Sequence, residues 1–416
     1  MKKLNYTRFW LLAAGALLCA GSANAQTADK ATLDLLVKKG LVSRTEADAV
    51  FRQNQASGAS AAVVTSATGA AKITLGGYVQ AGYTWARYTP KGGSSATNDN
   101  GFDLNRAVLE ITARLNDNWS AFVNPEFDNT RSGDHHNYLD AAGITWDSKE
   151  FGAATAGLKK TNFGVEENTH PTQLKAITSS VLTGYFVDGL GFASRHVGLF
   201  WDGFLSDVDG VSYGFAVTNA KQDQFKAFGD NNKISFWANA AYTTGSFTTA
   251  KSKTPRSFTL GANLGWQRDS AGFVGTPEIF GYNPYVKGTL GNFTLVAEML
   301  GAYVAQDNAS RALPYGFNGT ASYRINDIEP LVRFSYVDTD GTYGLSTDQN
   351  ALANLPGPGA NEGFDKAVSV FAGANFYLSS FVTFGAGYEY TRFRDGDGAT
   401  KKADAHAIRA QLQAVF

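Results

Sequence analysis

The last segment of the chain alternates strictly between apolar and polar side chains. Ile408, Leu412 and Phe416 fall on one face, while Arg409 and Gln411 point the other way. Successive side chains on a strand point to opposite sides, so a period of two that ends on an aromatic residue predicts a strand with one face in lipid. The pattern alone therefore raises the prospect of a membrane protein.

The same alternation recurs in segment after segment beyond Lys72. Residues 103–115 place Leu109 and Ile111 on one face, and Arg106 and Glu110 on the other. Comparable sets occur in 73–85, 211–217, 258–266 and 382–390. Each fits a strand with lipid on one side and polar filling on the other. Counting such segments predicts an all-β fold, a transmembrane antiparallel β-barrel of roughly sixteen strands.

The connections between these segments alternate in length. The long ones include 87–101, 161–194 and 339–365, and the short ones include 116–118, 326–327 and 379–380. Long external loops and short periplasmic turns are typical of an outer-membrane barrel. The stretch 243–256 departs from this rhythm, because it is too long for a tight turn.

One connection, 161–194, is long enough to have its own role. A barrel of about sixteen strands is wide enough to hold water, so a pore follows unless something narrows it. The loop carries Glu166, Glu167, His170 and Lys175 and shows few alternating signals. We expect it to fold inward and form the constriction; the alternatives are an external flap or a latch between protomers.

The first residues have the pattern of a signal peptide. Three basic residues precede a short apolar stretch, and an Ala-Asn-Ala sequence ending at Ala25 supplies the small residues that signal peptidase cleaves. We therefore assign 1–25 as a signal peptide. The sole cysteine, Cys19, lies inside it, so the mature chain has no disulfide or thiol chemistry. A lipoprotein signal around Cys19 is the alternative.

Between the signal peptide and the barrel the pattern changes twice. Residues 26–54 are expected to form a periplasmic helical segment, because Leu33, Leu36 and Val37 recur at helical spacing. This segment is either a tail with transient helix or a self-associating stalk. Residues 55–71 form an Ala/Ser/Gly-rich linker. Residues 72–416 are assigned to the outer-membrane β-barrel porin domain.

Composition agrees with this interpretation without proving it. The chain is 44% hydrophobic and 18% charged, with a mean hydropathy of -0.20. A transmembrane barrel has such a composition because half of each strand faces water. The formal net charge of -1 gives no indication of nucleic-acid binding.

The sequence lacks the groupings that catalysis or metal binding require. None of the histidines has a serine-containing elbow nearby, so we expect no catalytic residues and no enzyme activity. His135 and His136 lie beside Asp134, but adjacent side chains on a loop diverge more often than they chelate. We expect no metal site and no cofactor.

Four stretches of the barrel segment resemble the phosphate-selective porin O and P family. They are Gly-Phe-Asp-Leu-Asn-Arg-Ala-Val-Leu-Glu at 101–110 with Asp-Asn-Trp at 117–119, Gly-Leu-Lys-Lys-Thr-Asn-Phe-Gly at 157–164, Glu-Pro-Leu-Val-Arg-Phe-Ser-Tyr at 329–336, and Ala-Asn-Phe-Tyr-Leu at 374–378 with Tyr-Glu-Tyr at 388–390. The resemblance implies a homotrimeric outer-membrane channel of about sixteen strands that passes small inorganic or organic anions.

In that family, anions are thought to move along basic side chains of the pore wall, which replace lost hydration at several shallow sites. Arginine suits phosphate because it donates two hydrogen bonds, and lysine acts as a point charge. The candidate anion-pathway residues are Arg106, Arg114, Lys159, Lys160, Lys287, Arg324, Arg333 and Arg409. Each either conducts anions or pairs with a lumen carboxylate such as Glu298 or Glu389.

Three departures from the family pattern concern selectivity more than fold. Asn105 precedes Arg106 where the family usually has an arginine pair, Asn162 replaces a common proline, and Trp237 lies near the place of a frequent arginine. We expect passive diffusion of small hydrophilic solutes with a preference for anions such as phosphate. The alternatives are a general or cation-preferring porin, and a structural protein that links the outer membrane to the envelope.

The terminal strand also indicates partners and location. A last aromatic residue after alternating apolar positions resembles the signal read by the barrel-insertion machinery, here at Phe416. We expect the protein in the outer membrane of a Gram-negative-type cell, in contact with outer-membrane lipid, with its N-terminal segment in the periplasm.

Overall fold

The computed structural model describes residues 62–65, 72–91, 96–127, 139–205, 210–220, 233–244, 256–268, 278–305, 311–342, 345, 364–395 and 402–416. The expected signal peptide, the helical segment and most of the linker lie outside these residues, as do His135 and His136. Assignments that depend on them remain predictions.

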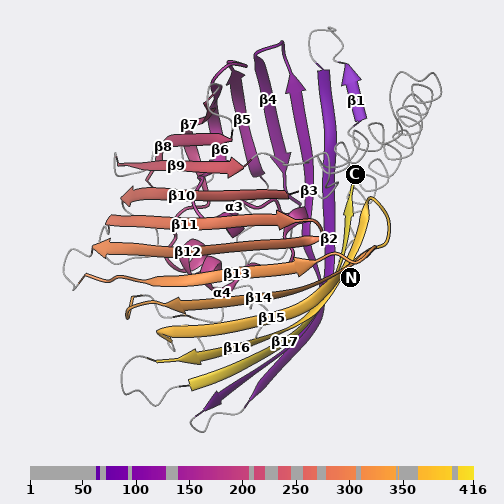
Figure 1. Cartoon of the computed structure of the whole chain (residues 1–416), viewed down its shortest axis with the longest axis vertical. Helices are drawn as coiled ribbons and strands as arrows, with labels where there is room; N and C mark the ends of the chain where they lie inside the picture. The colour runs from indigo at the N-terminus through magenta and orange to yellow at the C-terminus, as the bar shows by residue number, and fades with distance from the viewer. Residues whose placement is uncertain are drawn as a thin grey trace, which may run out of the picture.

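Strands β2–β17 form one closed antiparallel barrel (Figure 1). Each strand pairs with the next along the chain, and β17 closes the barrel on β2. The strands are β1 (Ala62–Thr65), β2 (Lys72–Lys91), β3 (Thr97–Arg114), β4 (Trp119–Pro125), β5 (Leu139–Asp147), β6 (Gly152–Lys160), β7 (Arg195–Phe204), β8 (Val211–Asn219), β9 (Ile234–Thr244), β10 (Arg256–Arg268), β11 (Glu278–Leu290), β12 (Phe293–Ala305), β13 (Tyr315–Tyr323), β14 (Ile328–Asp338), β15 (Lys366–Tyr377), β16 (Val382–Arg394) and β17 (Lys402–Val415). The predicted fold of sixteen barrel strands is confirmed.

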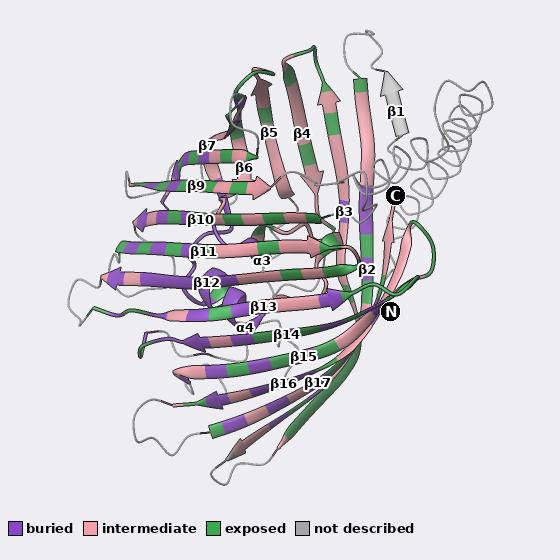
Figure 2. Ribbon diagram, viewed as in Figure 1, coloured by how far each residue is buried: buried purple, intermediate pink, exposed green. Residues whose placement is uncertain are grey.

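Alternation along the strands separates the two faces of the wall. On β10, Phe258, Leu260 and Leu264 are exposed on the outer surface, whereas Asn263 and Gln267 are buried on the inner one. Figure 2 shows this alternation as changing bands along most strands. An apolar outer surface on a closed barrel leaves no unpaired backbone in lipid.

β1 covers an edge that β17 leaves open. Phe416 exchanges two backbone hydrogen bonds of 2.9 Å with Gly77, so β17 ends opposite that residue. The first four residues of β2, 72–75, pair instead with β1, as in Val64 opposite Ile73. The predicted linker thus contains a short strand, and the free edge of β2 is not left exposed.

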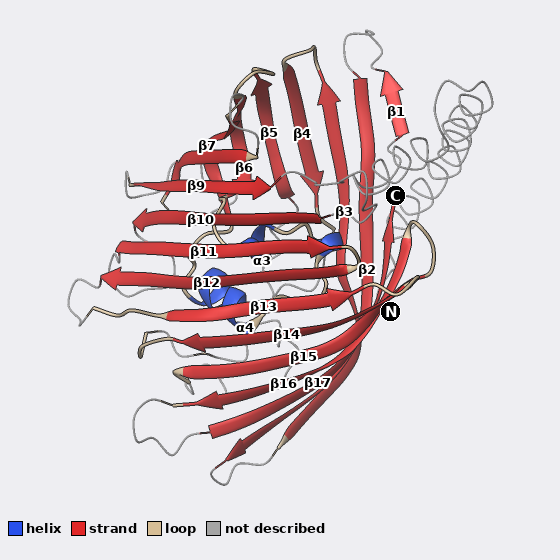
Figure 3. Cartoon of the chain, viewed as in Figure 1, coloured by secondary structure: helices blue, strands red, loops and turns tan. Residues whose placement is uncertain are grey.

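Among the described residues, the helical turns all belong to the connection between β6 and β7. They are α3 (Val165–Asn168), η1 (Pro171–Gln173), α4 (Val181–Gly184) and the π-helical turn η2 (Tyr185–Gly189). α4 contacts β13, β14 and β15, and Figure 3 shows the helical turns behind the strands of the wall. No helix among the described residues is long and apolar enough to cross a bilayer.

The two ends of the barrel differ in their connections. Gly291 and Asn326 adopt positive φ angles in the short turns that join β11 to β12 and β13 to β14. Positive φ suits glycine and asparagine in tight turns. We call this the short-turn end and the opposite one the long-loop end. Most of the irregular stretch 243–256 lies outside the described residues.

Candidate functional site: the lumen and its inward loop

The loop 161–194 crosses the lumen directly after it leaves β6. Glu298, on the inner face of β12, accepts hydrogen bonds from the backbone N–H groups of Val165 (2.7 Å) and Glu166 (3.0 Å). Asn283 of β11 donates to Glu298 at 3.0 Å and accepts from the N–H of Gly164 at 3.2 Å. These bonds satisfy backbone donors that the first turn of a helix leaves unpaired. They fix the start of the loop to β11 and β12.

A buried ionic cluster holds the loop to β14 and β16. The guanidinium of Arg333, only 1% exposed, lies 3.2 Å from the carboxylate of Glu166 and 3.0 Å from that of Glu389, and it donates to the carbonyl of Thr178. Arg409 of β17 lies 3.7 Å from the other oxygen of Glu389. We call Arg333, Glu166, Glu389 and Arg409 the Arg333 clamp. Its two arginines are covered by the loop and the wall.

Glu166 also joins separate parts of the loop. It accepts hydrogen bonds from the backbone N–H of Ser180 (2.9 Å), from the Ser180 hydroxyl (2.5 Å) and from the Thr183 hydroxyl (2.6 Å). Ser180 in turn caps α4 by accepting from the N–H of Thr183 at 3.2 Å. One carboxylate therefore connects α3, α4 and the barrel wall.

The loop also reaches the other side of the barrel. His170 lies 2.9 Å from the carboxylate of Glu110 on β3. Gln80 of β2 and Gln413 of β17 donate to backbone carbonyls within the η1 turn at 3.3 and 3.2 Å. The loop thus contacts β2, β3 and β17 as well as β11, β12, β14 and β16. It is folded into the barrel, as the sequence predicted, and the external flap is wrong.

Toward the long-loop end, the loop packs on an apolar inner wall. The ring of Phe192 lies 4.8 Å from that of Phe163 and 5.2 Å from that of Trp237. The wall contributes buried residues to the same core, including Leu300, Ala302, Val304, Val337, Phe393, Ala403 and Ala405. The alternating pattern of the strands predicts polar filling throughout the interior. That was wrong for this half, because the apolar face of the loop needs apolar partners.

A compact charge network surrounds the root of the loop. It consists of Arg106, Lys160, Arg195, Glu126, Asp140 and Glu167. Arg106 lies 2.6 Å from Glu126 and 3.0 Å from Asp140, and Arg195 contacts the same Asp140. Lys160 lies 3.1 Å from Glu167. Cations and carboxylates balance in number, so the network anchors the loop without adding net charge.

Glu167 makes this anchor sensitive to pH. Burial alone would raise the pKa of Glu167, but Lys160 and Arg195 outweigh it and hold the pKa below the ordinary value of 4.5. Because its pKa is lowered in the docked loop, the ionised carboxylate of Glu167 stabilises docking at pH values above the ordinary pKa. This contribution is lost as the pH falls through the lowered pKa of the docked state. We expect hydrogen-exchange protection at 165–169, corrected for intrinsic rates, to fall only when the pH drops below the ordinary pKa of glutamate. Glu167→Gln should flatten the profile; an unaltered profile in this variant would contradict the assignment.

The predicted site residues fall into different environments. Arg106 and Lys160 belong to the charge network, and Arg333 and Arg409 belong to the Arg333 clamp. All of these side chains have carboxylate neighbours. The structure therefore brings the predicted residues into two separate ionic groups, and it does not bring them into one continuous ladder.

The remaining predicted residues are more accessible. Arg114 and Arg324 are exposed at the short-turn end, beside the turns that follow β3 and β13. Lys159 contacts Asp202 near the loop root. Lys287 is exposed on the inner face of β11, with its amino group 5.4 Å from the centroid of the Tyr285 ring.

One accessible cation was not among the predicted residues. Lys175 of the loop lies 2.8 Å from Glu329 on β14, and its carbonyl accepts a hydrogen bond of 2.9 Å from Asn375. Lys175 has no strand periodicity to place it, because it lies in the loop, and Arg195 is only the first residue of β7. Their facing charges come from strands far away in the sequence.

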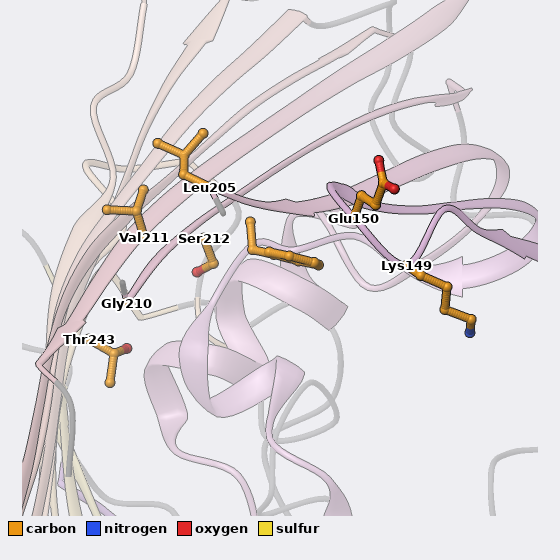
Figure 4. Close-up of a pocket in the computed structure, with 8 residues that line it drawn as sticks. Lys149, Glu150, Leu205, Gly210, Val211, Ser212 and Thr243 are labelled. Carbon is orange, nitrogen blue, oxygen red and sulfur yellow. The ribbon is translucent and has the colours of Figure 1, made fainter. Parts of the chain in front are cut away.

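A pocket of about 750 Å³ opens at the short-turn end (Figure 4). Its lining is contributed by the turn after β5 and by the ends of β7, β8 and β9, and includes Lys149, Glu150, Leu205, Ser212 and Thr243. One cation and one carboxylate balance among apolar and hydroxyl groups, so the pocket has no evident charge preference. No lining residue belongs to the loop. Across the described residues, no three potential metal ligands come together.

A closed barrel with an apolar outer surface and a loop folded into its lumen defines a porin of the outer membrane. The sequence profile of the phosphate-selective porin O and P family matches residues 73–416. Since this match covers most of the chain, the protein belongs to that family. Comparison with curated protein sequences found no match.

Solved structures show the same fold at low sequence identity. The anion-selective porin from Comamonas acidovorans is 13% identical, with a TM-score of 0.59 and alignment over 83% of this chain and 100% of that one. The outer-membrane channel DcaP of Acinetobacter baumannii is 12% identical, with a TM-score of 0.55 over 85% and 100%. OmpT of Vibrio cholerae in its trimer form is 12% identical, with a TM-score of 0.51 over 83% and 100%.

Proposed function

We propose that this porin conducts small hydrophilic anions, phosphate among them, by passive diffusion past the inward loop. The observation that carries the proposal is the unequal exposure of charges on the inner surface. Lys175 is 31% exposed, whereas its partner Glu329 is 3% exposed. Lys287 is exposed, whereas Glu298 on the adjacent strand is 4% exposed. A passing ion meets the amino groups before the carboxylates.

Accessible carboxylates are present but have partners. Glu110 lies beside His170, and Asp202 contacts Lys159 and accepts a hydrogen bond of 2.9 Å from Asn162. These contacts reduce the field that each carboxylate presents to the lumen. Lysines spaced along the passage offer weak sites for an anion, which favours both entry and release.

The buried arginines have a different role in this proposal. Arg333 and Arg409 are 1% and 3% exposed, so they hold the loop and do not contact the passing ion. Lys159, Lys175 and Lys287 would form the anion pathway, with Arg114 and Arg324 at the mouth. The structurally similar porin from Comamonas acidovorans is anion-selective, which supports the same preference.

We also propose that the mature chain begins after Ala25 and assembles as a homotrimer. The trimer form of the structurally similar Vibrio cholerae OmpT supports this assembly. Strands β4, β5 and β6 are short, and their outward positions include Ala121, Ala142 and Ala156. Short strands with small outward side chains suit contact with a neighbouring barrel. The final strand, ending at Phe416, would be read by the barrel-insertion machinery, and the N-terminal segment would lie in the periplasm.

Lys287→Glu should weaken the anion preference. The change alters the local charge by two units; about 8 Å from the ion path in water this is worth about 1 kcal/mol for each ion, unfavourable for chloride and favourable for potassium. The two effects together change the relative chloride to potassium permeability about thirtyfold. Reversal potentials of single channels in a KCl gradient measure this ratio. Arg311→Glu is the matched control, because Arg311 is exposed at the long-loop end, with its guanidinium 5.6 Å from the centroid of the Tyr303 ring. Equal shifts in both variants would contradict the assigned pathway.

A further inference from the structure

Basic residues form a row across neighbouring strands at the long-loop end. Lys366 of β15 pairs in register with Arg394 of β16, Arg394 pairs with Lys402 of β17, and Lys402 pairs with Lys91 of β2. Directly opposed residues on antiparallel strands stand on the same face, with β-carbons about 5 Å apart. The side chains of Lys366, Arg394 and Lys402 therefore share one face.

That face is the outer surface of the barrel. The residues that follow or precede them in sequence, Ala367, Phe393 and Ala403, are at most 1% exposed and belong to the interior core. Because side chains alternate along a strand, the basic residues must point away from the lumen. Arg394 and Lys402 are exposed. None of these cations can therefore serve the ion pathway.

The charges on this surface are only partly balanced. Lys366 lies 3.1 Å from Asp338, and Arg392, one row closer to the membrane centre, lies 3.0 Å from Asp404. Arg394 and Lys402 form no ion pair within the part of the chain that the structure describes. We call Lys366, Arg392, Arg394 and Lys402 the outer basic patch; within the described residues its four cations form ion pairs with two carboxylates.

The rows below the patch show its depth in the membrane. Tyr390 pairs with His406, and Tyr388 pairs with Ile408, which in turn pairs with Trp85 of β2. Aromatic residues concentrate where the hydrocarbon meets the headgroups. The surface passes from aliphatic and aromatic residues to cations toward the long loops, so the patch lies at the headgroups of the outer leaflet.

Arg268 also points outward at the long-loop end, but a carboxylate on the next strand neutralises its charge. Arg268 of β10 pairs in register with Glu278 of β11, and the two side chains lie 3.1 Å apart. The guanidinium of Arg268 also lies 5.4 Å from the centroid of the Trp266 ring. An ordinary outward cation of this barrel is thus neutralised, and the patch differs from it.

We propose that the outer basic patch binds the phosphorylated headgroup of a lipid in the outer leaflet. Arginine can donate two parallel hydrogen bonds to a phosphate, and lysines beside it supply further positive charge. Basic clusters next to a membrane-spanning segment attract anionic lipid headgroups in the same way. The tyrosines below the patch would pack on the lipid near its headgroup. This site is separate from the lumen and is independent of the proposed ion selectivity.

Native mass spectrometry of the full chain in detergent tests this site. The probe is purified lipid A carrying two phosphates, compared with lipid A whose phosphates have been removed. We expect Arg394→Gln combined with Lys402→Gln to weaken binding of the phosphorylated probe about thirtyfold, with little effect on the dephosphorylated one. Arg256→Gln is the control, because Arg256 is an exposed residue at the short-turn end of β10. Unchanged conductance verifies that each variant folds.

Three outcomes would overturn the proposal. The first is equal binding of phosphorylated lipid A by the double variant and by the Arg256→Gln control. The second is displacement of the lipid by millimolar inorganic phosphate, which would make this a site for free phosphate. The third is a change of oligomeric state in the double variant with lipid binding intact, which would assign the patch to contact with another copy of the chain.

Discussion

Arg333→Ala is expected to release the inward loop, with a loss of about 3–5 kcal/mol in the free energy that holds it. The substitution leaves Glu166 and Glu389 buried without their shared cation, and it removes the bond to the carbonyl of Thr178. The barrel itself retains its strand pairing. We therefore expect rapid proteolysis within 161–194 and a larger single-channel conductance, while the barrel still resists unfolding in detergent.

Arg324→Ala is the matched control for this experiment. Arg324 is exposed at the short-turn end, where its guanidinium lies 3.8 Å from the centroid of the Tyr377 ring. Its removal should leave the loop protected and change stability by no more than about 0.5 kcal/mol. If Arg333→Ala instead reduced anion selectivity and left the loop protected, Arg333 would belong to the ion pathway and the clamp assignment would be wrong.

Gly281→Val is expected to displace the end of the loop from the wall. A Cβ atom at Gly281 would overlap the ring of Phe192 and would lie 2.9 Å from Cζ of Phe163. Both rings are buried in the apolar core of the lumen, so neither can move without disturbing its neighbours. Overpacking of this kind costs about 1–3 kcal/mol. Hydrogen exchange at 186–193 should become faster, and the conductance should change with it.

The same strand provides the control. A Cβ atom at Gly288 would come no closer than 4.0 Å to another residue, at Cδ2 of Phe258. Valine suits a strand, so Gly288→Val should leave exchange in the loop unaltered. Similar exchange rates in the Gly281 and Gly288 variants would show that the contact with Phe192 does not hold the loop.

The outer surface of the barrel was predictable because lipid imposes one rule on every strand. Leu260, Leu264 and Ile408 all fall on exposed outward positions, as a period of two requires. The inward position of 161–194 was predictable for the opposite reason. A long segment without strand periodicity has to lie outside the wall or within it, and its charged residues favoured the lumen.

The partners of the inner cations were not predictable from the same pattern. Arg333 and Glu166 are separated by 167 residues, and periodicity assigns a face but no neighbour across the lumen. The apolar half of the interior is also visible in the sequence. Val337, Phe393 and Ala403 occupy inward positions near the long loops, where a polar residue would be expected in a water-filled passage.

The reversal potential across a planar bilayer with a KCl gradient tests whether this barrel is a passive channel with an anion preference. We expect a reversal potential with the sign set by chloride, and a chloride current that falls when phosphate is added to the same side. A potential set by potassium, with no effect of phosphate, would contradict the anion preference and would identify the barrel as a cation-preferring porin.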